Sequence, residues 1–483
     1  MGSIDMKSTR REILIGSAGA AMLAAMPQAY ALGAKTLTAT TRSLEVNGKA
    51  AKVFALLGPN GQPGIILYPG ERFALKLENQ TATPTSIHWH GQLPDWKQDG
   101  FPWPQTPAIT AGMSQAYDFA PTTGTFWMHS HEGLQEQQLM AAPLIVQDAA
   151  SATADIQQVV MMLHDFSFKS PDELLARLTK QGAMSHNDMG AGINMSSGGM
   201  SEMGMGPSGM TGSADLNDID FDAYLANERT LADPQVMRVA PGQNIRLRII
   251  NGASSTNFWI DLGQLTGAVI AVDGHDVVPV AGSKFPIAIA QRLDILVRLP
   301  AVGAYPLLAQ VEGKPNRTGI ILATPGASIG KVSDMAAMST PAVDLSLESR
   351  LVSARPLASR KVDNTIPLRL GGNMNPYAWT LNGKLWPNPD VLMVKPGQRV
   401  IIDMVNDSMM SHPMHLHGHE FQVVAINNTR INGAVRDTVL VSPMGRVAIA
   451  FDADNPGRWA LHCHNLYHMA AGMMTEVRYP GIV

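Results

Sequence analysis

The segment "VKPGQRVIIDMVN", residues 394–406, recurs in variant form twice more in this 483-residue chain. "LYPGERFALKLEN" (67–79) and "VAPGQNIRLRIIN" (239–251) share its Pro-Gly pair, its alternating apolar residues and its final asparagine. A Pro-Gly pair followed by such alternation is typical of a turn that leads into a half-buried β-strand. The copies are separated by the length of a domain, so we expect three related β-rich domains.

A second set of repeats supports the same period. "TTGTFWMHSH" (122–131), "AVGAYPLLAQ" (301–310) and "NPGRWALHCH" (455–464) each follow one copy of the first repeat. Two small, polar stretches, "QDAASATADI" and "TPGASIGKVSDMAAMSTPA", are typical of linkers between domains. We therefore predict an all-β fold of three tandem sandwich domains, which span residues 34–148, 156–324 and 340–483.

Composition narrows the class of protein. Hydrophobic residues make up 45% of the chain and charged residues 16%, which allows large buried cores. The net charge of −4 offers no electrostatic reason to expect a nucleic-acid partner. Cys463 is the only cysteine, so it cannot form an internal disulfide. A lone thiol is often a buried small hydrophobe, but the histidines on either side of Cys463 suggest another role.

The first 31 residues predict an export signal. Arg10 and Arg11 form a twin-arginine pair, an apolar stretch follows, and the small-residue site "AYA" (29–31) ends it. The apolar stretch is too short and too rich in alanine and glycine for a membrane span, so we expect cleavage rather than anchoring. The pattern predicts recognition by the twin-arginine (Tat) export machinery and a periplasmic mature protein without a membrane anchor. A fortuitous Arg-Arg pair is the alternative.

Histidines occur at matching positions of the first and third domains. Each copy of the Pro-Gly repeat ends in an asparagine. Nine residues after it, the first domain has His88 and the third has His415, whereas the second has Ile260. Five residues after the glycine of the second repeat stand His129 and His462, whereas the second domain has a leucine. Each of these four histidines begins a His-x-His pattern. Eight histidines at corresponding positions of two like domains suggest one site shared between those domains.

Strand geometry gives the His-x-His pairs a direction. Along a strand, residues i and i+2 project to one side and residue i+1 to the other. Four such pairs that face one another supply eight imidazoles, a set that suits a cluster of borderline metals and copper above all. Cys463 must point to the opposite side of its strand, where it can join His412, His468 and a methionine as a blue-copper electron-transfer set. The backbone from Cys463 to His462 and His464 would then carry electrons to the cluster.

With "HWHG", "HSH", "HPMHLHGH" and "HCHNLYHMAAGM", the chain resembles the three-domain bacterial multicopper oxidases, the laccase-like and cuprous-oxidase family of copper-tolerance type. The resemblance covers nearly the whole mature chain. It implies three cupredoxin-like Greek-key domains and four copper ions: one type 1, in the third domain, one type 2 and two type 3. The implied ligands are His412, Cys463, His468 and axial Met473 for type 1; His88 and His415 for type 2; and His90, His129 and His464 for one type 3 ion, with His131, His417 and His462 for the other.

The family also uses acids to deliver protons to the cluster. Asp99, nine residues after His90, matches the family's acidic position near the cluster, although a surface role in a Gly-bearing turn is the alternative. The family often places another acid after the second type 1 histidine, but "HMAAGMM" has none. Unless another carboxylate substitutes, we expect the proton path to differ from that of close relatives. We expect ordinary roles for the four remaining histidines, His164, His186, His275 and His419.

A methionine-rich stretch interrupts the second domain. Before it, "SPDELLARLTK" (170–180) predicts a short helix, with Ser170 and Glu173 as a capping box. Residues 184–210 then hold seven methionines among glycines and serines, a composition that cannot build a core. Thioethers suit Cu(I), so we expect Cu(I) to bind at Met184, Met189, Met195, Met200, Met203, Met205 and Met210. A disordered insertion of biased composition is the alternative.

Three functions are compatible with these motifs. The methionines and the export signal favour a cuprous oxidase of periplasmic copper tolerance, which couples one-electron oxidation of Cu(I) to the four-electron reduction of O₂ to water. A laccase would oxidise phenols or aromatic amines with the same coppers, through an open pocket beside His468. A copper-binding protein without turnover is the third, but non-catalytic relatives lose the ligands that are present here. We expect a monomer whose partners are O₂ and either Cu(I) or a small phenol.

Overall fold

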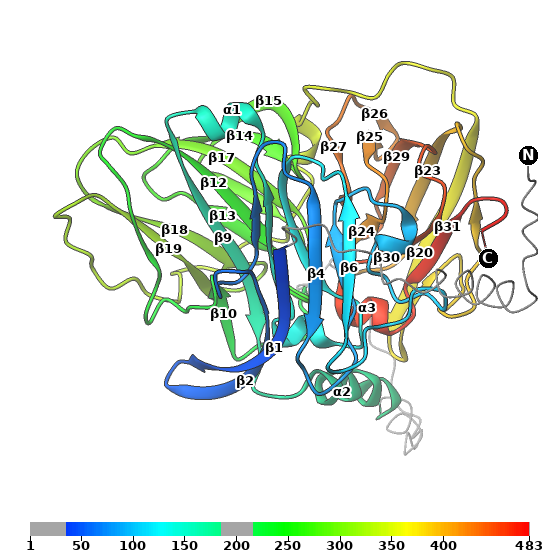
Figure 1. Ribbon diagram of the computed structural model, residues 1–483, viewed down its shortest axis with the longest axis horizontal. Helices are drawn as coiled ribbons and strands as arrows, with labels where there is room; N and C mark the ends of the chain where they lie inside the picture. The colour runs from blue at the N-terminus through cyan, green and yellow to red at the C-terminus, as the bar shows by residue number, and fades with distance from the viewer. Residues whose placement is uncertain (1–34, 185–215, 483) are drawn as a thin grey trace, which may run out of the picture.

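The computed structural model describes residues 35–184 and 216–482. Their strands confirm the predicted all-β fold, because the sheets pack in pairs as three cupredoxin-like β-sandwiches (Figure 1). The predicted export signal, His186 and the methionine-rich insertion beyond Met184 lie outside the described residues. The domain limits inferred from the repeats stay a prediction.

The first sandwich pairs a sheet of order β2-β1-β4-β6 with a sheet of order β3-β8-β7-β5. Leu37, Phe73 and Phe126 lie in the core between them. Its elements are β1 (Lys35–Val46), β2 (Lys49–Leu57), β3 (Ile65–Leu67), β4 (Phe73–Asn79), β5 (Ile87–His90), η1 (Trp96–Gln98), β6 (Ser114–Phe119), β7 (Gly124–Ser130), η2 (Gln135–Gln138) and β8 (Ala141–Val146). The short helix α1 (Ala149–Thr153) leads into the second sandwich.

The second sandwich pairs the order β10-β9-β12-β17-β14-β15 with the order β11-β19-β18-β13-β16. Its core includes Leu247, Phe258 and Ile295. Its elements are β9 (Ile156–Phe166), α2 (Pro171–Met184), β10 (Ala223–Ala226), β11 (Val236–Arg238), β12 (Asn244–Asn251), β13 (Phe258–Asp261), β14 (Gly267–Val272), β15 (His275–Gly282), β16 (Lys284–Ile287), β17 (Arg292–Arg298), β18 (Ala304–Val311) and β19 (Arg317–Ala323).

The third sandwich consists of two packed sheets. One has the strand order β21-β20-β23-β29-β25-β26, and β27 also pairs with β25 in it; the other has the order β22-β31-β30-β24-β28. Its core includes Trp379, Ile402 and Cys463. Its elements are η3 (Glu348–Arg350), β20 (Asn364–Met374), β21 (Tyr377–Leu381), β22 (Leu392–Met393), β23 (Arg399–Asn406), β24 (His412–Leu416), β25 (Phe421–Ile426), β26 (Thr429–Arg430), β27 (Val435–Arg436), β28 (Thr438–Val441), β29 (Arg446–Asp452), β30 (Arg458–Cys463), α3 (Leu466–Ala470) and β31 (Met474–Arg478).

The asparagine that ends each repeat has the same function in all three sandwiches. Asn79, Asn251 and Asn406 are buried at the last positions of β4, β12 and β23. Each accepts the amide of the residue two positions on through Oδ1 and donates through Nδ2 to carbonyls of the following loop and of a more distant segment. Because buried polar groups require hydrogen-bond partners, this side chain fixes the loop that leads to the next strand. In the first and third sandwiches that strand carries histidines.

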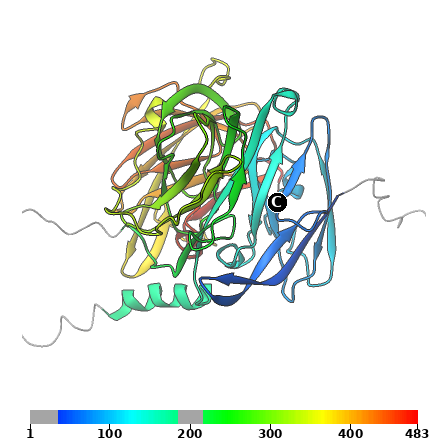
Figure 2. The same cartoon turned by 90° about the vertical axis from the view of Figure 1, so that its left-hand side faces the viewer.

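The sandwiches contact one another around a common centre. Figure 1 shows the second on the left and the third on the right, with the first in front of them, and Figure 2 shows the same arrangement from the side. Helix α2 runs along one edge (Figure 1). Ser170 Oγ accepts the Glu173 amide at 3.2 Å, which is half of the predicted capping box, whereas the Glu173 carboxylate pairs with Arg177. Leu174 and Leu178 of α2 pack into the core of the third sandwich. Among the described residues, no helix is long and apolar enough to cross a membrane.

Candidate metal centres

Strand β30 presents side chains to two different sites. It pairs with β24, so that Cys463 lies opposite Met414 and His462 lies opposite His415. His462, Cys463 and His464 are all buried. Since neighbouring residues of a strand project to opposite faces, the thiol lies on one side of the sheet and the two imidazoles on the other.

The thiol side of β30 holds a group of two histidines and one cysteine. Cys463 Sγ lies 3.6 Å from His412 Nδ1 and 3.6 Å from His468 Nδ1, and the two nitrogens are 3.1 Å apart. His412 begins β24, and His468 lies on α3, where Asn465 caps the first turn by accepting the His468 amide. Met473 is buried beside this group, with its amide donating to the His468 carbonyl and its carbonyl accepting the Cys463 amide.

The eight histidines of the His-x-His pairs gather on the other side of β30. They come from β5, β7, β24 and β30 or the residues that follow these strands, and thus from the first and third sandwiches. Nitrogens of neighbouring members lie within 4.8 Å of one another in three groups, of which the first two share His90. The groups are His88, His90 and His415; His90, His129 and His464; and His131, His417 and His462. The structure therefore brings together every histidine that the sequence assigned to the cluster.

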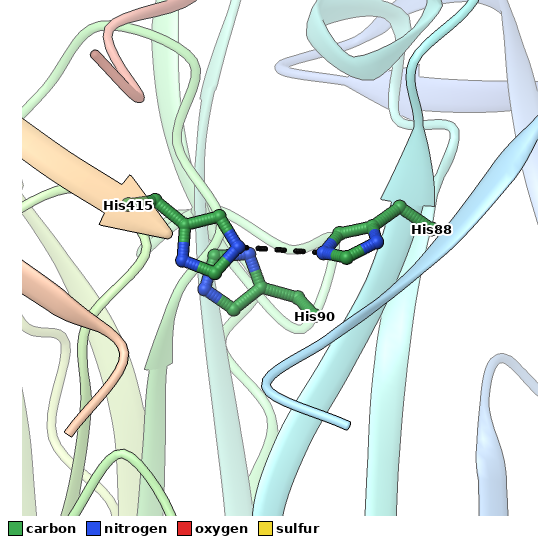
Figure 3. A group of neighbouring side chains, drawn as sticks. All are labelled: His88, His90 and His415. Carbon is green, nitrogen blue, oxygen red and sulfur yellow. Dashed lines mark hydrogen bonds between the residues drawn. The ribbon is translucent and has the colours of Figure 1, made fainter. Parts of the chain in front are cut away.

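Three pairs of ring nitrogens face each other directly, two of them across the first and third sandwiches and one within the third. The Nε2 atoms are 3.4 Å apart in His88 and His415, where Figure 3 shows the two rings on opposite sides of the gap with His90 behind. The same distance is 3.3 Å between His129 and His464. It is 3.0 Å between His417 and His462. Two nitrogen acceptors at such distances call for a shared proton or a metal ion between them.

Burial keeps seven of the eight cluster imidazoles, and that of His412, neutral. Desolvation, reinforced by the neighbouring imidazoles, holds their pKa values well below the usual value, and the pKa of His462 falls to about 4. The other histidines with a strongly lowered pKa are His90, His129, His131, His412, His415, His417 and His464. Burial, with Asp218 nearby, instead raises the pKa of the Cys463 thiol. At neutral pH the nitrogens are free to bind a metal, whereas the thiol must first lose a proton.

Carboxylates outside the cluster orient its rings. Asp99, the acid expected from the sequence, is buried, with Oδ2 2.8 Å from His417 Nδ1 and Oδ1 3.2 Å from His88 Nδ1. The sequence did not reveal Asp437, whose carbonyl lies 2.8 Å from His415 Nδ1. Hydrogen bonding at one ring nitrogen leaves the other available to a metal. Asp437 lies between β27 and β28 and reaches His415 only because β24 pairs with β28, where Thr438 stands opposite His415. No local motif therefore identifies it.

Glu136 is a second acid that the sequence did not reveal. Its Oε2 lies 2.7 Å from His129 Nδ1, and its Oε1 lies 3.9 Å from His464 Nδ1. Burial, with a smaller contribution from Asp165, raises its pKa well above the usual value and so favours the protonated carboxyl. Glu136 stands five residues after His131. This short distance along the chain is the one feature of the sequence that could have pointed to it as an acid near the cluster. Glu136 places a buried carboxyl beside two cluster histidines, whereas "HMAAGMM" supplies no acid.

Asp218 contacts the outer ring nitrogen of His468. Its Oδ2 lies 3.0 Å from His468 Nε2 and accepts hydrogen bonds from the Tyr377 hydroxyl and Asn465 Nδ2, each at 3.1 Å. Burial opposes ionisation, but His468, Tyr377 and Asn465 outweigh it and hold the carboxyl pKa below its usual value. Since 250 residues separate Asp218 from His468, only the tertiary structure could reveal the pair.

The remaining described histidines lie outside these groups. His164 Nδ1 contacts the Gly252 carbonyl, and His419 lies between the His417 carbonyl and the Tyr479 hydroxyl. His275 lies 3.5 Å from a carboxylate oxygen of Glu420. Their partners are ordinary structural ones.

The donor atoms fit copper. One group offers two imidazole nitrogens and a thiol, and the other offers buried, neutral imidazoles whose ring nitrogens face one another. Nitrogen and soft sulfur donors of this kind favour copper over magnesium, calcium or manganese, which prefer oxygen.

Comparison with known proteins identifies the family. Three family models, each described as "Multicopper oxidase", match residues 38–151, 158–326 and 360–481. The chain belongs to the multicopper oxidases. It is therefore an oxidase with copper cofactors, which passes electrons from a reducing substrate to O₂.

Relatives match over nearly the whole length of the oxidase. Multicopper oxidase MmcO of Mycobacterium tuberculosis is 33% identical over 476 residues, covering 94% of this chain and 89% of that protein. A copper resistance protein A homolog of Pseudomonas syringae pv. tomato is 29% identical, covering 92% and 91%. The crystal structure of Fet3p, described as a multicopper oxidase that functions in iron import, matches with a TM-score of 0.73 at 19% identity, covering 92% and 90%. This last likeness concerns the fold alone.

Loading the copper-free oxidase with Cu(I) near pH 7 should release about one proton per chain, because only the thiol must be deprotonated. A titration in weakly buffered solution with a pH indicator measures the release. The Cys463→Ser variant is the control and should release almost none. Release of several protons per chain would contradict the neutral state of the buried imidazoles.

Proposed function

We propose that this multicopper oxidase is a cuprous oxidase. Four Cu(I) ions, one O₂ and four protons would yield four Cu(II) ions and two waters. The observation that carries the proposal is the buried carboxylate of Asp218, 3.0 Å from the outer nitrogen of His468. It puts a negative charge where electrons would enter, which suits a cationic substrate.

The donor groups support four resident copper ions. His412, Cys463 and His468 would hold the type 1 ion, with Met473 as a weak axial ligand. His88 and His415 would hold the type 2 ion, and the two type 3 ions would have His90, His129 and His464, and His131, His417 and His462. When bound, copper takes up electrons singly at the type 1 site and delivers them to O₂ at the cluster.

Strand β30 offers the path between the two sites. The backbone of Cys463 is bonded directly to both His462 and His464. The Cys463 carbonyl also accepts a hydrogen bond from His462 Nδ1 at 3.0 Å. We therefore assign electron transfer to these three residues, which lie within a single buried strand or directly after it.

Methionines near the type 1 histidines support a Cu(I) substrate. Met409 and Met410 precede His412 by three and two residues, and Met469 directly follows His468. Met409 is 74% exposed, whereas Met410 and Met469 pack against the core of the third sandwich. Exposed thioethers such as that of Met409 can hold Cu(I) at the protein surface.

The residues on either side of the methionine-rich insertion pack into the core of the third sandwich. Leu178 of α2, before the insertion, and Ile219, after it, pack in one core with Trp379. The Trp379 ring lies 4.1 Å from that of His468. This anchoring supports collection of Cu(I) by Met184, Met189, Met195, Met200, Met203, Met205 and Met210.

The surroundings of His468 favour Cu(I) over a phenol. A laccase would need an opening beside this ring, yet neither the His468 nor the Asp218 side chain has exposed surface. An electron from a metal ion can pass through the Asp218 carboxylate, whereas a phenol would need to displace it.

The predicted export signal supports a periplasmic location, and with it a role in copper tolerance. Residues 1–31 carry the twin-arginine pair and an apolar stretch. A relative with 29% identity is named a copper resistance protein A homolog. We propose a monomer exported through the twin-arginine machinery.

Deletion of residues 184–210 tests the substrate. We expect the deletion to slow O₂ uptake with Cu(I) as substrate, because the thioethers that gather Cu(I) are lost. Oxidation of a phenol should continue as before or faster. Two results together would favour a laccase instead: the deletion leaves the rate of Cu(I) oxidation unchanged, and the intact protein oxidises a phenol faster than it oxidises Cu(I).

Asp218→Asn should lower kcat/KM for Cu(I) by about tenfold or more, equivalent to about 1.4 kcal/mol, because the negative charge beside His468 is lost. Steady-state O₂ uptake measures the effect. Asp220→Asn is the matched control, since Asp220 is exposed two residues away and pairs with Lys314. Equal losses in the two variants would argue against a substrate role for Asp218.

We assign proton delivery to Asp99, whose carboxylate contacts rings from both sandwiches. Asp99→Asn should slow the reaction of the fully reduced protein with O₂ by about 100-fold and leave reduction of the type 1 site by substrate unchanged. Stopped-flow measurement of the two half-reactions separates these effects. Asp95→Asn serves as control, because Asp95 is exposed and caps η1. A normal O₂ half-reaction in Asp99→Asn would exclude this role.

A further inference from the structure

Two crossed ion pairs join the second and third sandwiches beside the cluster. Arg292 and Asp273 belong to the second sandwich, and Arg436 and Asp437 belong to the third; all are buried. Arg292 donates to both carboxylate oxygens of Asp437, at 2.8 Å for Nη1 and Oδ1. In the opposite direction, Arg436 Nε donates to Asp273 Oδ2 at 2.9 Å. In these two pairs each sandwich contributes one cation and one anion, so that each buried charge has an opposite partner. Arg436 also donates to Glu348, a third buried carboxyl.

Asp437 extends this network to two cluster histidines. Its Oδ1 lies 3.0 Å from His90 Nε2, and its carbonyl oxygen lies 2.8 Å from His415 Nδ1. The Thr438 hydroxyl donates to the same Oδ1 at 2.9 Å and lies near both rings. His90 Nδ1 is buried without a hydrogen-bond partner. A ring that donates from Nε2 to a carboxylate keeps its lone pair on Nδ1, which is then available to a metal.

Arg292 also contacts the first sandwich. Its Nε donates to the Thr125 carbonyl at 3.3 Å, and its amide donates to Asp273 Oδ1 at 2.8 Å. This one side chain therefore touches residues of all three sandwiches. Space around it is closely filled, because a Cβ on Gly91 would fall 2.5 Å from Asp437 Oδ2 and 2.8 Å from Arg292 Nη2.

We propose that Arg292 is a positioning residue for the copper cluster, although its sandwich supplies none of the cluster histidines. By holding both oxygens of Asp437, the guanidinium fixes the orientation of His90 directly. It acts on His415 through the Thr438 hydroxyl, which lies 2.9 Å from Asp437 Oδ1 and 3.2 Å from His415 Nδ1. A carboxylate held by a planar two-pronged donor cannot rotate, whereas one held by a single donor can. The inference rests on the ligand roles proposed above for these two histidines.

The test compares Arg292→Met and Arg292→Lys with Arg399→Met. Arg399 is a matched control, because it is buried and makes the same two-pronged contact with Asp452. Its other side-chain partner is the Ala358 carbonyl, so its hydrogen bonds include no cluster histidine. For each copper-loaded variant we would measure copper per chain during competition with a chelator, the type 2 EPR signal and the blue type 1 absorbance. The type 1 absorbance is an internal control for folding.

In Arg292→Met we expect cluster copper to be held about 10–100-fold less tightly, with an altered type 2 EPR signal and an intact blue absorbance. Arg292→Lys should be intermediate, because an ammonium can hold one oxygen firmly but not both. Arg399→Met should keep wild-type copper retention and EPR.

Wild-type EPR and copper retention in Arg292→Met would overturn the inference. If that variant does not fold, Arg292→Lys decides: an altered type 2 signal with the blue absorbance retained supports the inference, and an unchanged signal overturns it. If the wild-type protein itself lacks a type 2 signal and firmly held cluster copper, the proposed ligand roles fail, and that result is distinct from failure of Arg292 alone.

Discussion

The alternation of side chains along β30 is the constraint on which the rest of the structure depends. Because neighbouring residues of a strand face opposite ways, His462 and His464 share one side of the sheet, and Cys463 occupies the other. Two sites with different donors are thereby joined by a few covalent bonds. A helix would not separate them in this way, since its side chains follow a different period. The β-sandwich is thus part of the chemistry as well as its support.

Burial of the imidazoles has a second consequence. Histidines this far from water are held neutral, as the pKa of about 4 for His462 illustrates, so their ring nitrogens are free for metal at neutral pH. The buried carboxylates of Asp99 and Asp437 then determine which nitrogen each ring presents. An ionised carboxylate in such a place needs a partner of its own. For Asp437 that partner is Arg292.

The second sandwich therefore supports both sites without supplying a cluster histidine. Asp218 lies against His468, and Arg292 reaches Asp437. Asp165, also buried, accepts the amides of Ser254 and Ser255, and the Ser254 carbonyl in turn accepts the amide of Leu466 at the start of α3. This chain of contacts explains how a sandwich that lost the ligand positions of its neighbours still contributes to the geometry of the metal centres.

The sequence alone determined the three-fold repeat, the all-β fold and the membership of both histidine groups, because a two-residue period and matched spacings are local properties of the chain. Asn79, Asn251 and Asn406 mark equivalent strand ends for the same reason. Only the tertiary structure revealed Asp218 and Asp437, which reach His468 and His90 across sandwiches, and Arg292, which reaches Asp437 in the same way. The number of residues between two positions does not encode such contacts, because they depend on how the sheets of different sandwiches pack together. A buried charge is then paired with whichever opposite charge this packing brings close.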